Sequence, residues 1–98
     1  MQKNITSIFG YQQITSLSAA TNLTVPAVDK NGAIGGPTMA LIRCESQNVR
    51  WRDDGTAPTA SVGQLLNTGD AMEYDGDLKR IQFIETSASA KLNICYYS

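Results

Sequence analysis

The chain has 98 residues, of which 42% are hydrophobic and only 17% are charged, and its formal net charge is −1. This length fits a single domain, and the near-neutral charge excludes the basic surface that binding to a nucleic-acid backbone requires. No apolar run approaches the roughly 20 residues that span a bilayer, and the N-terminus lacks a secretory signal pattern. We therefore expect neither nucleic acid nor a membrane as partner, and we expect the chain to stay in the cytoplasm in which it is made.

The first part of the chain, residues 1–37, is rich in Ser, Thr, Gln and Asn and ends in a glycine-rich run. Tyr11–Leu17 and Asn22–Val25 are candidate strands within it. Residues 1–10 are interpreted as an extended arm that orders on a neighbouring molecule. This part is thus predicted to hold an arm and the first strands, within one domain overall.

Residues 38–98 are predicted to form the core of the domain from short strands separated by turns, as in an antiparallel β-sandwich. The clearest strand is Met39–Glu45, in which Ala40, Ile42 and Cys44 share one apolar face. Alternation with period two is typical of a strand that buries one face. This segment is therefore expected to be mostly buried.

The next predicted strand, Asn48–Arg52, places Val49 and Trp51 on one face and two arginines on the other, so Trp51 is expected to point inward. A turn follows at 53–55, where Gly tolerates positive φ and Asp accepts backbone hydrogen bonds. The remaining predicted strands are Val62–Leu66, Ala71–Tyr74, Lys79–Glu85 and Lys91–Tyr97.

The last two predicted strands carry matching apolar stripes. Ile81 and Phe83 form one stripe, and Leu92, Ile94 and Tyr96 form the other. Such stripes can face each other across a hairpin, and we predict that these two strands are hydrogen-bonded neighbours.

The residue types argue against an enzyme. Histidine is absent, which removes the usual general base near neutral pH. Cys44 and Cys95 are expected to be free thiols, and two cysteines do not form a zinc site. The acidic residues stand beside glycines in predicted turns, so we predict no catalytic residues and no cofactor. Calcium is a weaker alternative, with oxygen ligands from Asp70, Glu73, Asp75 and Asp77.

Several segments resemble a group of small tailed-phage proteins that are described as virion-associated β modules. They are residues 49–63, 76–78, 81–84 and 90–97, so the resemblance covers roughly the last 60 residues. It implies a structural role in the virion and brings no enzymatic residues with it.

By analogy with phage cement proteins, we expect a single-domain, jelly-roll-like sandwich that binds other virion proteins. The major capsid protein is the expected partner, and the chain is expected to form a homo-oligomer, with a trimer as one form. The predicted subunit-contact residues are Arg50, Arg52, Asp53, Asp54 and Tyr97.

Two other interpretations of function stay open beside capsid cement. The chain can instead be a head-tail or tail component of the virion. It can also be a glycan-binding receptor module, in which aromatic rings stack on sugars with Arg50 and Asp53 as hydrogen-bonding neighbours. The aromatic candidates for that role are Trp51, Tyr74, Tyr96 and Tyr97.

Overall fold

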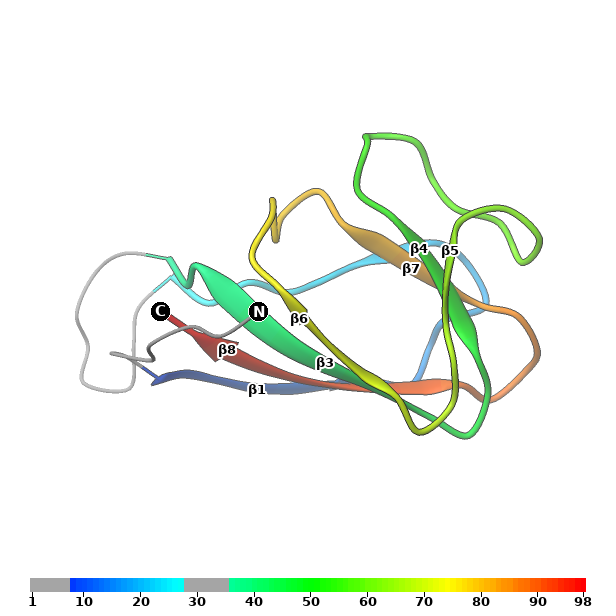
Figure 1. Cartoon of the computed structure of the whole chain (residues 1–98), viewed down its shortest axis with the longest axis horizontal. Helices are drawn as coiled ribbons and strands as arrows, with labels where there is room; N and C mark the ends of the chain where they lie inside the picture. Colours follow the sequence, from blue (N-terminus) through cyan, green and yellow to red (C-terminus); the bar gives the residue numbers. More distant parts are fainter. Residues whose placement is uncertain (1–7, 28–35) are drawn as a thin grey trace.

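The computed structural model describes residues 8–27 and 36–98, which form β-strands and no helix. The strands are β1 (Ile8–Ile14), β2 (Thr21–Asn22), β3 (Met39–Glu45), β4 (Val49–Arg52), β5 (Gln64–Leu66), β6 (Ala71–Tyr74), β7 (Gln82–Glu85) and β8 (Lys91–Tyr97). They make two four-stranded antiparallel sheets that lie as two layers (Figure 1).

The order of the strands identifies the fold. One sheet has the order β1-β8-β3-β6 and the other β2-β7-β4-β5. Consecutive strands change sheets at every step except β4 to β5, which is how an eight-stranded jelly roll is wound. The prediction of an all-β, antiparallel, jelly-roll-like sandwich is confirmed.

The core lies between the two sheets and follows the period-two pattern of the sequence. In β3, Ala40, Ile42 and Cys44 are fully buried, as predicted for that strand. In β8, every second residue from Leu92 to Tyr96 is likewise buried. Because neighbouring side chains of a strand point to opposite faces, each sheet turns one apolar face to the other.

The predicted pairing of the last two strands is wrong. β7 and β8 belong to different sheets, and β8 pairs with β1 and β3 instead. Their apolar stripes are both buried in the core, but they belong to opposite layers. β8 is seven residues long and its two neighbours match that length, whereas β7 has only four residues. Partners of equal length leave fewer backbone groups without hydrogen bonds.

Turn chemistry shortens two of the predicted strands. The predicted strand Lys79–Glu85 begins only at Gln82, because the amides of Arg80 and Ile81 donate to the carbonyl oxygen of Asp77. Val62–Leu66 begins only at Gln64, because Thr59 and Val62 exchange two backbone hydrogen bonds in a tight turn.

The N-terminal part of the chain contributes to both sheets. β1 begins and ends three residues before the predicted strand Tyr11–Leu17, and β2 covers only the beginning of Asn22–Val25. The buried residues of this part are Phe9, Ile14, Leu17 and Leu23. Residues 8–10 of the predicted arm lie in β1, and residues 1–7 lie outside the described part of the chain.

Candidate functional site

An open groove of about 430 Å³ lies between the end of β4 and the loop that leads to β5. We call it the hairpin groove. Its lining residues are Trp51, Arg52, Asp53, Asp54, Val62, Gly63 and Gln64. The loop 53–63 extends away from the sheets in Figure 1.

Arg50 holds this loop against β4. Its guanidinium group donates to the carbonyl oxygens of Ala60, at 3.1 Å, and Gly63, at 3.0 Å. Gly63 has φ of +140°, and a Cβ atom at this position would lie 3.1 Å from the carbonyl oxygen of Trp51. The loop therefore packs tightly on β4 at this point, and a residue without a side chain is needed there.

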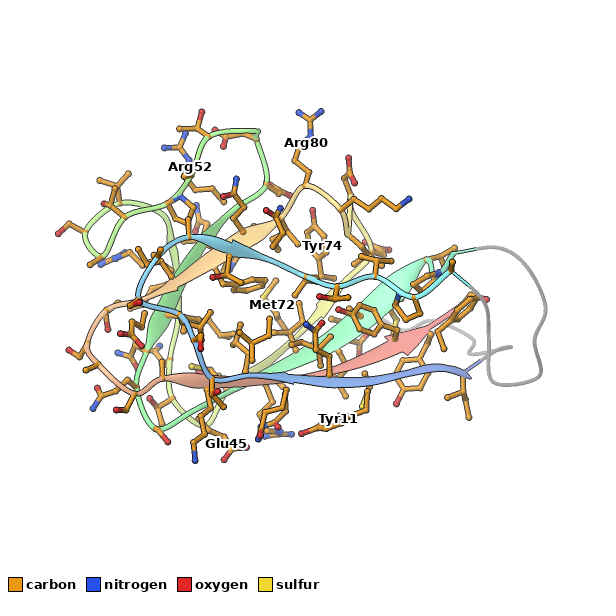
Figure 2. All side chains as sticks on the ribbon, turned by 180° about the vertical axis from the view of Figure 1, so that it is seen from behind. Tyr11, Glu45, Arg52, Met72, Tyr74 and Arg80 are labelled. Atoms are coloured by element: carbon orange, nitrogen blue, oxygen red, sulfur yellow. The ribbon has the colours of Figure 1, made fainter. Side chains whose placement is uncertain are left out.

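Trp51 and Tyr74 link the groove to the other sheet. The two rings meet edge to face with centroids 6.0 Å apart, and the Tyr74 hydroxyl donates to Oδ2 of Asp53 at 2.7 Å. Figure 2 places Tyr74 between the two layers. Burial, together with the Asp53 carboxylate, raises the pKa of Tyr74 well above its ordinary value. Trp51 packs against the core while lining the groove, so its predicted inward orientation is confirmed.

Arg52 and Asp54 form an exposed ion pair at the rim of the groove. Two guanidinium nitrogens of Arg52 donate to the two carboxylate oxygens of Asp54, at 2.5 and 3.1 Å. The hydrogen bond from Arg52 lowers the pKa of Asp54 below its ordinary value. The charges of both side chains are therefore largely compensated before any ligand arrives.

The acidic side chains of the groove are engaged within the chain. Both carboxylates of the groove already accept hydrogen bonds within the chain, Asp53 from Tyr74 and Asp54 from Arg52. Over residues 8–27 and 36–98 the structure holds no group of three or more acidic or cysteine side chains that could bind a metal, and the weaker calcium set from Asp70 to Asp77 forms none. A ligand in the groove would contact the indole of Trp51, the side-chain amide of Gln64 and the ion pair of Arg52 with Asp54.

Tyr97 belongs to a second surface, the outer face of the β1-β8-β3-β6 sheet. The register places Tyr11, Cys95 and Leu41 side by side across three strands, and Ile8 beside Tyr97 in the next row. We call these five residues the outer patch. The side chain of Tyr11 is 62% exposed and that of Ile8 is 58% exposed. Figure 2 shows Tyr11 pointing away from the other layer.

Polar and charged side chains cover most of the rest of this face. Asn93 lies at their centre, where its oxygen accepts hydrogen bonds from Tyr11 and Gln13 and its amide nitrogen donates to Glu45. Because these polar groups are bonded to one another, they hold Tyr11 in a fixed position beside the apolar residues of the outer patch.

The structure separates the five predicted contact residues into two groups. Arg52, Asp53 and Asp54 line the hairpin groove, with Arg50 behind them in the loop contact. Tyr97 lies in the other sheet, on its outer face, and Arg52 stands on the side of the molecule opposite Tyr11 (Figure 2). No single surface can use all five residues. Their role in subunit contacts stays a prediction.

The two cysteines are free thiols, as predicted. Cys44 is buried, its thiol donates to the carbonyl oxygen of Gln47, and burial raises its pKa. Cys95 is half-buried within the outer patch, where its hydrogen bond with Tyr97 raises the pKa of that tyrosine.

Together, the fold and its two surfaces define a jelly-roll β-sandwich with one open polar groove and one apolar outer patch. The described part of the chain contains no helix that is long and apolar enough to cross a membrane. Comparison with protein-family models, with curated proteins and with solved structures finds no match to this chain.

Proposed function

We propose that the protein is a structural component of a tailed-phage virion, and that it acts as a capsid cement or decoration protein. In this role it stabilises the shell through contacts with the major capsid protein and with copies of itself. The single observation that carries the proposal is the outer patch. It gives a small domain of near-zero net charge two exposed large apolar side chains on one face, and surfaces of this kind mark contacts with other molecules.

The composition of the outer patch fits a protein interface. Two tyrosines and two aliphatic residues share one face with hydrogen-bonded polar neighbours, and aromatic residues are enriched in interfaces while charged residues are depleted from their centres. Removing apolar surface from water is favourable by about 25 cal/mol per Å², and this gain must exceed the entropy that association costs. A domain of this size has modest stability alone and gains from such contacts.

The resemblance of residues 49–63, 76–78, 81–84 and 90–97 to small phage proteins supports the virion as the place of action. Jelly rolls recur in viral capsid domains, and the fold is therefore consistent with a role in a virion. A trimer, a head-tail position and a tail position stay predictions.

The proposal is tested on purified particles of the phage that encodes the chain. Mass spectrometry should find its peptides at many copies per particle. A few copies per particle would favour the head-tail or tail position, and absence from particles would overturn the proposal.

A pair of double variants tests the outer patch itself. Ile8→Ser with Tyr11→Ser should lower the amount bound to particles severalfold, because both side chains are exposed and neither supports the core. The control is Val62→Ser with Leu65→Ser, which removes similarly exposed apolar side chains near the hairpin groove. Equal loss from both double variants would contradict binding through the outer patch.

A glycan-binding module is a second candidate, and the hairpin groove favours it. The indole of Trp51 lines an open groove together with the Gln64 amide, and aromatic rings are suitable surfaces for sugars. Trp51 is the only tryptophan, so its fluorescence reports on this groove directly. A saturable change in fluorescence on titration with glycans of the host surface, lost in Gln64→Ala, would support this candidate. An unchanged spectrum across those glycans would exclude it.

A further inference from the structure

The edge strands of the two sheets differ in length and charge. β2, β5 and β6 have two, three and four residues, and β6 also carries Glu73. β1 has seven residues, with neither a charged residue nor a proline among them. Among the described strands, β1 pairs only with β8, and it forms the near border of its sheet in Figure 2.

An edge strand presents backbone groups that can pair with another chain, and proteins usually protect such edges with charges, prolines or very short strands. The protection on β1 is limited to an irregularity between Ile8 and Gly10. From Gly10 to Ile14 the register with β8 is continuous. This regular run is centred on Gln12, and no strand within residues 8–27 and 36–98 pairs with its other side.

We propose that β1 pairs antiparallel with β1 of a second copy, around a twofold axis at Gln12 that is perpendicular to the sheet. The two four-stranded sheets then become one continuous sheet of eight strands. This inference rests on the proposed function, since it names the first partner of the cement protein. Such an axis keeps both outer faces on the same side, so the outer patches of the two copies adjoin.

Two observations favour a second copy as the occupant. A twofold contact at Gln12 places Gln13 opposite Tyr11 of the second copy and Gly10 opposite its Ile14, and β1 can pair with itself without repulsion because it has no charge. The outer patch also extends onto β1 through Ile8 and Tyr11. Pairing at this edge therefore joins two exposed apolar surfaces into a larger one, which is the surface a capsid would cover.

Gln13 is the position for the test, because it is exposed on the outer face and lies next to the centre of the proposed contact. Gln13→Lys and Gln13→Glu should each weaken self-association in sedimentation equilibrium, on the order of tenfold, because like charges then lie near each other across the axis. An equimolar mixture of the two variants should recover the association of the wild type. The matched controls are Ser87→Lys and Ser87→Glu, at an exposed turn position away from β1.

Recovery in the mixture would support pairing of β1 with its own copy, because a foreign strand at this edge gives no such effect. A wild-type chain that is monomeric at every concentration, or a mixture no stronger than the single variants, would overturn the inference. These results are distinct from those that judge the proposed function. A chain that forms dimers but is absent from particles would contradict only the cement role. A chain that is monomeric but present in many copies per particle would contradict only the pairing of β1.

Discussion

Gly63 shows at the scale of one residue how the hairpin groove keeps its shape. Gly63→Ala should destabilise the fold by about 1 to 3 kcal/mol, because φ of +140° is strained for alanine and the new methyl group meets backbone and Cβ atoms at 3.1 to 3.3 Å. Gly69→Ala also replaces a glycine at positive φ, but nothing lies within 4 Å there, so it should cost less. Urea unfolding measures both, and equal losses would contradict a steric contribution at Gly63.

Tyr96 connects a single buried hydroxyl to the pH dependence of stability. Its hydroxyl donates to Oε1 of Gln12 at 2.6 Å, and burial raises its pKa above the ordinary value of about 10. Since the folded state then holds this proton more tightly than the unfolded state, stability is complete below about pH 10 and falls as the pH rises further.

Replacing Tyr96 by Phe should therefore lower both the stability at pH 7 and the dependence of stability on alkaline pH. At pH 7 the loss of the hydrogen bond to Gln12 should lower the free energy of unfolding by about 1 kcal/mol. Above about pH 10, the variant should lose stability with a smaller slope than the wild type, because one titrating group is gone. Identical slopes in alkaline urea unfolding would show that Tyr96 does not contribute.

At the scale of elements, Asp53 joins the loop 53–63 to β6 through the Tyr74 hydroxyl. Asp53→Ala should lower stability by about 1.5 to 3 kcal/mol, because it removes the charged acceptor of the hydrogen bond that the Tyr74 hydroxyl donates. Hydrogen exchange should accelerate across the loop. Asp54→Ala is the matched control, since its exposed ion pair with Arg52 stabilises little. Equal effects of the two substitutions would contradict the link to β6.

The observed strand bounds match the predicted ones where the apolar alternation ends at turn residues. β3, β6 and β8 have the predicted bounds, because turns or bends flank β3 and β6 and a turn precedes β8. β5 and β7 are shorter than predicted because backbone hydrogen bonds at Thr59 and Asp77 form turns inside the apolar stretches. Alternation alone does not separate the last residues of a turn from the first residues of a strand.

At the scale of the whole molecule, the period-two pattern predicted which side chains are buried but not which strands are neighbours. A stripe such as Ile81 and Phe83 is equally suited to an adjacent strand of the same sheet and to the opposite layer. The class of fold followed from the alternation and from the resemblance to phage modules, whereas the strand order depends on contacts between strands that are distant in the sequence.

The hairpin groove could be predicted in part from the sequence, whereas the outer patch could not. Trp51 to Asp54 are consecutive, so the aromatic and charged part of the hairpin groove was visible as one short segment. The outer patch joins residues from Ile8 to Tyr97, and each of them alone looks like an ordinary strand residue. Only the register of three strands brings them onto one face.

We propose that the outer face of the β1-β8-β3-β6 sheet binds other virion proteins. Imaging virion particles that contain this chain, at side-chain resolution, would show this contact directly. We expect density for this jelly roll in many copies over the shell, with Tyr11, Leu41 and Tyr97 buried against capsid protein. Density with that face turned to solvent, or a shell without this domain, would contradict the account.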